Sequence, residues 1–199
     1  MQTGGIGFVG AGTDVSNLES YLEDASNLLK YTDLKTTNGT LPLGVGFINW
    51  GADLSAALPL IAKYRPAAVW FFAPTSLSSL LDWTAKYRGT SPHTQIWVQV
   101  GSVQEALDAA IEVQPDVLVV QGTDAGGHGL AQGAGLISLL PEVSDAIAAQ
   151  IPVESKRPLL IAAGGIADAR GTSAALLLGA HGIVTVSYTH LTLPTNREV

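Results

Sequence analysis

The 199-residue chain has a net charge of −7, 47% hydrophobic residues and no cysteine. The acidic balance argues against nucleic acid or an anionic membrane surface as a partner, because both bind clustered cations. The missing cysteines exclude disulfides, thiolate metal sites and cysteine nucleophiles. No apolar run reaches the roughly 20 residues of a transmembrane helix, and the start does not read as a signal peptide, so a cytoplasmic location is expected.

Short apolar runs alternate with amphipathic stretches along the chain, which is typical of βα units around a buried parallel sheet. The predicted strands are Ile6–Gly10, Leu43–Ile48, Ala67–Ala73, Gln95–Val100, Asp116–Gln121, Pro158–Ala163 and Gly182–Val186. The predicted helices are Asp14–Lys30, Asp53–Tyr64, Leu77–Tyr87, Ser102–Val113, Pro141–Gln150 and Asp168–Leu178. Several of these helices begin with a residue that commonly caps helix amides.

This alternation fits two α/β folds, an open doubly wound sheet and a (β/α)8 barrel, and periodicity alone does not separate them. The first strand lacks a dinucleotide-binding glycine pattern with its acidic partner. Glycine-rich turns instead follow the late strands, at Gly122–Gly129 and Gly164–Gly165, where barrels commonly bind phosphate. We therefore predict an α/β fold of the TIM-barrel type that is incomplete, with about seven of its eight strands.

One loop combines glycines with a histidine, at Gln121–Gly129 (QGTDAGGHG), directly after an apolar strand. Ligands bind at the carboxyl ends of parallel strands, which makes this loop a candidate site. His128 could be an ordinary loop side chain, a metal ligand or a general base. Zinc is disfavoured because no cysteine or regularly spaced histidine accompanies it, whereas a group that titrates near neutral pH suits a base. For Asp124 we favour a role in satisfying amides of the turn.

Gly164 and Gly165 end a predicted strand just before a helix capped by Asp168. Free amides at such a turn could hold a phosphate, and the alternative is a tight turn whose glycines only relieve steric conflict. The histidine loop one βα unit earlier favours the phosphate. Gln99 and Gln121 are amides in otherwise apolar strands and need partners if they are buried. Two glutamines at strand ends suit a flat heterocycle such as a flavin.

These residues carry a family resemblance. The segment Gln121–Gly129 resembles the signature of the nitronate monooxygenase family, formerly called 2-nitropropane dioxygenases. Ile161–Gly171 (IAAGGIADARG) is similar to a second family signature, and Leu178–Ile183 (LGAHGI) resembles the start of the family's last barrel strand. The likeness covers roughly residues 5–185. It implies an FMN-dependent (β/α)8 barrel that oxidises alkyl nitronates with molecular oxygen, giving a carbonyl compound and nitrite.

The resemblance also implies roles for individual residues. His128 would be the catalytic base, or would hold the nitronate near the flavin. Glutamine side chains would contact the isoalloxazine ring, while glycines would face the ribityl phosphate, and no metal is implied. The implied cofactor-binding residues are Gln99, Gln121, Gly122, Gly126, Gly127, Ala163, Gly164 and Gly165.

Two other functions stay open. An FMN-dependent enoyl-acyl-carrier-protein reductase shares the barrel and a Gly-Gly-His loop but takes hydride from a nicotinamide cofactor. A non-catalytic barrel that binds flavin or phosphate would use His128 only to satisfy its loop. The small-molecule partners expected for the first reading are a nitronate or nitroalkane and oxygen, with neither nucleic acid nor membrane.

The chain departs from the family pattern at both ends. A strand and helix are expected upstream of Ile6, and the last strand continues into Val186 and Ser187 where the family has Gly-Thr. Residues 187–199 read as neither a helix nor the family's continuation, so we expect a truncated FMN-binding barrel domain over residues 1–186 and a non-native tail. Unpaired strand edges should weaken such a fragment, and we expect it to bind FMN weakly or not at all.

Overall fold

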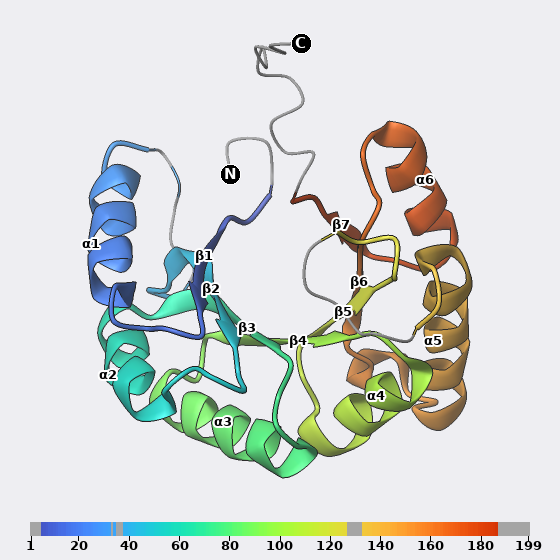
Figure 1. The fold of residues 1–199 in the computed structure, drawn as a ribbon, viewed down its shortest axis with the longest axis horizontal. Coiled ribbons are helices and arrows are strands. Elements are labelled where there is room, and N and C mark those ends of the chain that lie inside the picture. Colours follow the sequence, from blue (N-terminus) through green and yellow to red (C-terminus); the bar gives the residue numbers. More distant parts are fainter. Residues whose placement is uncertain (1–4, 33, 35–37, 127–132, 187–199) are drawn as a thin grey trace. The chain divides into compact units, whose positions relative to one another are not determined.

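The computed structural model describes residues 5–32, 34, 38–126 and 133–186. The chain divides into two compact units, of which the first holds residues 1–99 and 111–116 and the second holds residues 100–110 and 117–199. In both units strands alternate with helices along the chain (Figure 1). The α/β class predicted from the sequence is therefore confirmed. Residues 187–199 lie outside the described residues, and the domain boundary at residue 186 stays a prediction.

The strands of the first unit pair in parallel and in chain order. They are β1 (Phe8–Gly12), β2 (Leu41–Ile48), β3 (Pro66–Phe72) and β4 (Gln95–Val100), whose last residue is assigned to the second unit. The register places Gly46 opposite Trp70 and Trp70 opposite Trp97. Since side chains alternate along each strand, these three positions lie in one row on one face of the sheet.

Helices cover the other face of this sheet (Figure 1). They are α1 (Leu18–Leu29), α2 (Leu54–Tyr64) and α3 (Leu77–Thr90). The carboxylate of Asp53 caps α2 by accepting from the amides of Ser55 at 2.8 Å and Ala56 at 3.3 Å. Ser76 caps α3 in the same way. These caps satisfy amides that would otherwise have no partner at the first turn, so the predicted helix starts are correct here.

Aromatic packing joins the sheet of the first unit to α3. Phe47 and Phe71 face each other across the β2–β3 pair, and both are almost fully buried. The rings of Trp83 and Tyr87 stack beside them with centroids 5.8 Å apart and planes 10° apart. Large apolar rings buried in this way supply much of the stabilisation of a small core. This face of β2 and β3 is therefore structural.

The second unit has three parallel strands, β5 (Val117–Gln121), β6 (Leu159–Ala163) and β7 (Gly182–Val184), in that order. Its helices are α4 (Val103–Asp108), α5 (Leu136–Gln150) and α6 (Ala169–Leu177). Arg157 closes the far end of α5, because its Nε donates to the carbonyl of Ile151 at 2.7 Å. A 3₁₀ turn at Glu154–Lys156 leads from α5 to β6.

Several helix boundaries differ from the predictions, and two of the differences lie in the second half of the chain. The helix predicted over Pro141–Gln150 begins five residues earlier, at Leu136, with Pro141 inside it. The helix predicted over Ser102–Val113 is α-helical only to Asp108 and continues as a π-helix over Ala109–Val113. The first error has a physical cause in the loop before α5, which is described with the candidate site.

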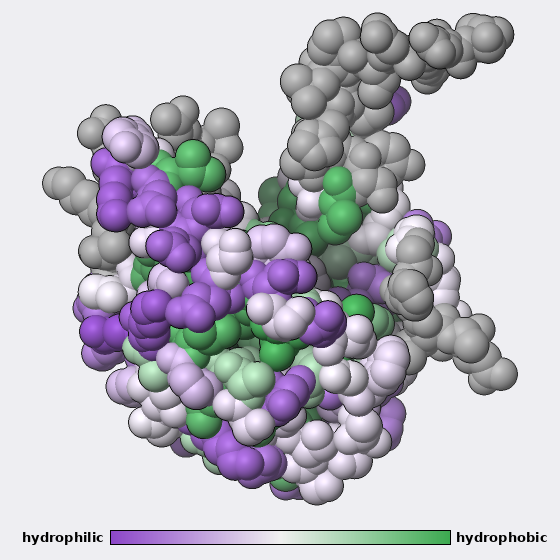
Figure 2. All heavy atoms as spheres, turned by 60° about the vertical axis from the view of Figure 1, so that its left-hand side comes forward, coloured by the Kyte–Doolittle hydropathy of each residue, from purple (hydrophilic) through white to green (hydrophobic). Residues whose placement is uncertain are grey.

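Within the described residues, no helix is long and apolar enough to cross a membrane. No cluster of three or more His, Asp or Glu side chains suited to a metal ion occurs in this part of the chain either. The face shown in Figure 2 mixes hydrophilic side chains with separate apolar patches. The surface of the first unit includes strongly exposed apolar side chains, such as Leu28, which is 71% exposed.

Candidate functional site in the glycine-rich turns

The carboxyl ends of β5 and β6 meet at one edge of the second unit. Gln121, the last residue of β5, lies opposite Ala163, the last residue of β6, and Ala163 lies opposite Val184. The amide of Gly122 then donates to the carbonyl of Ala163 at 3.1 Å, which extends the pairing into the loop. Two of the predicted cofactor residues, Gln121 and Ala163, are thus neighbours on one face of the sheet.

Gly122 is required by packing. A Cβ at this position would overlap the amide nitrogen of Leu136 and lie 2.8 Å from its Cα. No side chain fits there without moving the start of α5. The glycine predicted as a cofactor contact therefore has a structural role in the fold, and a flavin contact through its backbone stays a prediction.

Gly164 and Gly165 form the turn after β6, and both adopt left-handed backbone conformations, with φ of +103° and +69°. Residues with a Cβ rarely adopt such angles. A Cβ on Gly164 would also lie 3.0 Å from the carbonyl oxygen of Gly122. Steric requirements alone thus explain both glycines, which is the alternative to a phosphate site that the sequence left open. The turn is nevertheless open to a ligand, because Gly165 is exposed at the surface.

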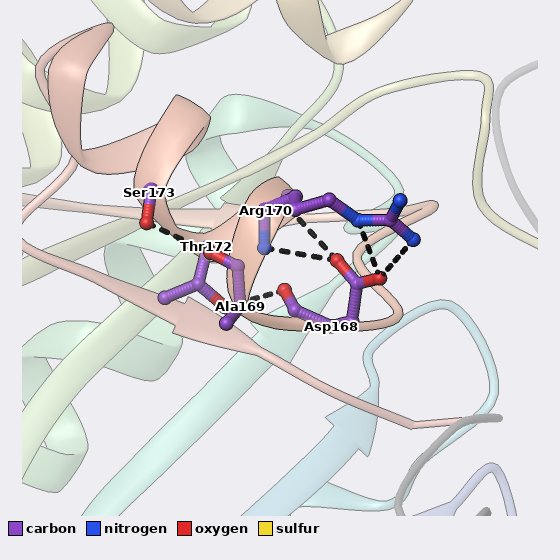
Figure 3. Close-up of polar contacts among 6 residues, drawn as sticks. Asp168, Ala169, Arg170, Thr172 and Ser173 are labelled. Carbon is purple, nitrogen blue, oxygen red and sulfur yellow. Dashed lines mark hydrogen bonds and ion pairs between the residues drawn. The ribbon is translucent and has the colours of Figure 1, made fainter.

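The start of α6 offers fewer free amides than the sequence suggested. The carboxylate of Asp168 accepts from the amides of Arg170 at 2.9 Å and Gly171 at 3.3 Å (Figure 3). The same carboxylate bonds the Arg170 guanidinium, and this side-chain hydrogen bond lowers the pKa of Asp168 to about 2. Two of the first-turn amides that were expected to be free for a phosphate are thus already bonded by Asp168.

The histidine loop is described only in part. Gly126 is exposed, and a Cβ on it would meet nothing within 4 Å, so packing does not demand glycine there. Gly127 and His128 lie outside the described residues. Their predicted roles stay predictions.

Asp124 was expected to satisfy amides of its own turn, but the hydrogen bond that the structure gives its carboxylate reaches another segment. Its Oδ2 accepts from the amide of Leu136 at 2.7 Å, twelve residues further along the chain. Leu136 is the first residue of α5, and the preceding Gly135 has no side chain to cap the helix. Asp124 is therefore the helix cap, supplied from a distant part of the sequence. Local sequence signals do not reveal such a cap, which explains why the helix start was placed at Pro141.

Gln99 lies on the face of β4 that also carries Gln95 and Trp97. The indole Nε1 of Trp97 donates to Oε1 of Gln95 at 3.1 Å. By alternation along the strand, Gln99 points to the same side. It is half-buried, and within the described part of the chain its amide has no hydrogen-bond partner. The same holds for Gln121 in the second unit. Among the described residues, the hydrogen-bonding capacity of both amides is therefore unused.

Aromatic rings fill the Gln99 side of the first sheet. Phe8 contacts Trp70 edge-on, with centroids 5.3 Å apart, and Trp97 at 5.0 Å. A Cβ on Gly44 would overlap the Phe8 ring. The Nε1 of Trp70 is buried and lacks a partner among the described residues. Trp70 lies opposite Trp97 in the parallel β3–β4 pair.

The backbone amides of the turn after β2 are bonded, but the buried Nδ2 of Asn49 lacks a partner among the described residues, and the turn exposes a large ring. The backbone amide of Trp50 donates to the carbonyl of Ala73 at 3.1 Å, and the residue as a whole is 64% exposed. Asn49 is buried and accepts from the amide of Phe72 at 2.9 Å, so its side chain continues the β2–β3 pairing. Ala73 has φ of +49°, a strained angle for a residue with a Cβ.

Within each unit, parallel strands pair in chain order and alternate with helices, as the strands of a (β/α)8 barrel do. Solved structures support this fold. One is a mutant of FabK from Thermotoga maritima, with a TM-score of 0.70 and 22% identity, covering 96% of this chain and 56% of that chain. Another is nitroalkane oxidase from Streptomyces ansochromogenes, with a TM-score of 0.68 and 22% identity, covering 94% and 59%. The predicted TIM-barrel fold is thereby confirmed.

The chain belongs to the nitronate monooxygenase family. The family model "Nitronate monooxygenase" matches residues 84–191. Nitronate monooxygenase npaC of Metarhizium robertsii is 46% identical over 186 residues, covering 90% of this chain and 50% of the relative. A nitronate monooxygenase of Neurospora crassa is 37% identical over 204 residues, covering 92% and 53%. The chain thus spans about half the length of these curated relatives. Membership makes it part of an oxidoreductase family and implies a flavin cofactor.

Proposed function

We propose that the protein oxidises alkyl nitronates with molecular oxygen, giving a carbonyl compound and nitrite, and that it does so with bound FMN. The observation that carries this proposal is the arrangement at one edge of the second unit. There Gln121 ends β5 beside Ala163, and the exposed Gly164–Gly165 turn follows Ala163. The sequence that follows Gln121 carries the histidine of the family signature.

The described residues fit the phosphate end of FMN. The turn at Gly164 and Gly165 has no side chains, and its left-handed backbone leaves Gly165 exposed. Backbone amides in such a turn can form a concave anion site. Because Asp168 already occupies the amides of Arg170 and Gly171, the phosphate would bind the turn itself.

The glutamines fit the ring end. Gln99 and Gln121 are half-buried amides without partners among the described residues, and an amide supplies both donors and an acceptor. We place both on the isoalloxazine, with Gly122, Gly126, Gly127 and Ala163 contributing backbone contacts. Bound FMN would supply the electron transfer from the nitronate to oxygen.

His128 is proposed as the residue that holds a proton for the substrate. A histidine can accept or donate a proton near neutral pH, and a general base of this kind contributes about 10²- to 10⁴-fold in rate. The glycines on either side of His128 would let the substrate approach the imidazole closely. The proposed partners are therefore a small nitronate and oxygen.

An assay of the full-length protein tests this function. Flavin-loaded protein is supplied aerobically with an alkyl nitronate, and nitrite and oxygen are measured. Nitrite release that needs oxygen but no nicotinamide cofactor supports the proposal. Oxidation of NAD(P)H by an enoyl thioester, without nitrite from the nitronate, would replace it with the reductase.

A further inference from the structure

Asp124 contacts both elements that follow the two strand ends of the proposed site. Its Oδ2 holds the first amide of α5 at 2.7 Å. Its backbone and Cβ lie beneath Gly165, since a Cβ on that glycine would be 3.0 Å from the Cβ of Asp124. A Cβ on Gly135 would likewise lie 3.1 Å from the Asp124 carboxylate. Two glycines from separate segments thus leave room for this one side chain.

Backbone hydrogen bonds tie the surrounding loop to the same two elements. The amide of Gly122 bonds the carbonyl of Ala163 at the end of β6, and the amide of Thr123 bonds the carbonyl of Ala134 just before α5, at 3.1 and 3.0 Å. The loop after β5 is therefore held between the end of β6 and the start of α5. The turn at Gly164–Gly165 packs directly against this loop, since a Cβ on Gly164 would lie 3.0 Å from the carbonyl oxygen of Gly122 and 3.1 Å from Ala125.

We propose that Asp124 is a positioning residue for the phosphate of the cofactor. By fixing the loop after β5 against α5, it sets the surface on which the Gly164–Gly165 turn lies, and so the direction of the turn's amides. This proposal rests on the proposed FMN function and adds to it a residue that shapes the phosphate end of the site.

The charge of Asp124 makes the proposal testable. An ionised carboxylate near a bound phosphate disfavours it by like-charge repulsion, so a purely electrostatic role would weaken phosphate binding. A positioning role predicts the opposite, namely that Asp124 strengthens phosphate binding. Asp124→Asn removes the charge but keeps an oxygen that can accept from the amide of Leu136. Asp124→Glu keeps the charge but displaces the carboxylate by one methylene. Asp124→Ala removes both the charge and the hydrogen-bond acceptor.

Amide hydrogen exchange gives a first readout that needs no cofactor. We expect Asp124→Ala to speed exchange both at the start of α5 and in residues 164–168, whereas Asp124→Asn leaves both segments near wild type. Asp53→Ala is the matched control, because Asp53 caps α2 in the first unit by the same kind of bond. Faster exchange at α5 alone, with residues 164–168 unchanged, would overturn the proposal and leave Asp124 as a helix cap only.

The preference for FMN over riboflavin gives the second readout, because riboflavin lacks the phosphate. Dissociation constants for both flavins are measured in the full-length protein by quenching of flavin fluorescence. We expect the FMN preference to fall at least about tenfold in Asp124→Ala and to fall in Asp124→Glu, but to persist or increase in Asp124→Asn. It should not change in Asp53→Ala.

The two measurements distinguish a failure of the Asp124 proposal from a failure of the proposed FMN function. An unchanged FMN preference in Asp124→Ala and Asp124→Glu contradicts the positioning role even if the wild type binds FMN tightly. If the full-length wild type binds neither flavin, the cofactor proposal fails, and the exchange experiment alone decides whether Asp124 orders residues 164–168. If Asp124→Ala does not fold, Asp124→Glu carries both measurements.

Discussion

The guanidinium of Arg170 holds the carboxylate of Asp168 through two hydrogen bonds, at 3.0 Å from Nε and 2.5 Å from Nη2 (Figure 3). The same carboxylate caps α6 through the amides of Arg170 and Gly171. Two amides in the first turn of α6 are therefore already bonded by an anion from the protein, which is why we propose that a cofactor phosphate uses the glycine turn that precedes the helix.

The first prediction concerns the pH dependence of this cap. The pKa of Asp168 is lowered from 3.8 to about 2, chiefly by its side-chain bond to Arg170. A lowered folded-state pKa means that the stabilisation is fully present above the unfolded-state pKa and is lost as the pH falls through the folded-state value. Asp168→Asn should therefore be less stable than wild type at pH 5, and the difference should shrink between about pH 4 and pH 2.

Thermal unfolding of both proteins across this pH range measures the effect as a difference in Tm. Subtracting the two curves cancels the other carboxylates, which titrate in both proteins. Asparagine keeps an oxygen that can cap the helix, so only the contribution of the Asp168 charge is lost, and the Tm at pH 5 should fall by roughly 1–4 °C. A difference that stays constant down to pH 2 would show that the ionised carboxylate contributes nothing.

The second prediction concerns Gly122. Replacing it with alanine should reduce the free energy of unfolding by about 1–3 kcal/mol, because the new Cβ would overlap the amide of Leu136. Gly126→Ala in the same loop is the matched control, since a Cβ there meets nothing within 4 Å. Its effect on unfolding should stay within about 0.5 kcal/mol. Equal losses in the two variants would contradict the packing account of the loop.

The third prediction separates ring contacts from phosphate contacts. Gln99→Ala and Gln121→Ala should each raise the dissociation constant for FMN by about 2- to 10-fold, the range of one or two amide hydrogen bonds. The constant for riboflavin should rise by the same factor, because the isoalloxazine is common to both flavins. Gln104→Ala serves as the control, since Gln104 bonds Asp108 within α4. A loss confined to FMN would move these glutamines to the phosphate end.

Strand positions were the most predictable part of the fold. The strand predicted over Gln95–Val100 has the same bounds in the structure. Both ends of every other predicted strand lie within two residues of the observed ends. Apolar runs bounded by glycine or polar residues identify buried parallel strands well, because both faces of such strands are covered. The first helix was less predictable. Asp14 was expected to cap it, but its carboxylate bonds the amide of Ser16 in a turn, and the helix begins at Leu18.

The candidate site was predictable where chemistry is local to the sequence. The glycine turns and strand-end glutamines could be read directly, and the structure places Gln121 beside Ala163 as expected. Tertiary contacts could not be read in the same way. The sequence offered Asp124 as a turn residue, because nothing near it shows that Leu136 would bring an unpaired amide to its carboxylate. The bonding of α6 amides by Asp168 is instead a local contact. The sequence indicates the capping residue, but we did not expect the cap to compete with a phosphate for these amides.

The central claim is that the full-length protein uses His128 to oxidise nitronates. The most direct test measures nitrite released per oxygen consumed, in flavin-loaded wild type and in His128→Ala with its flavin content checked by absorbance. We predict that the wild type forms nitrite from an alkyl nitronate and that the variant keeps its flavin but turns over about 10²- to 10⁴-fold more slowly. Equal rates in the two proteins, or no nitrite from the wild type, would contradict the account.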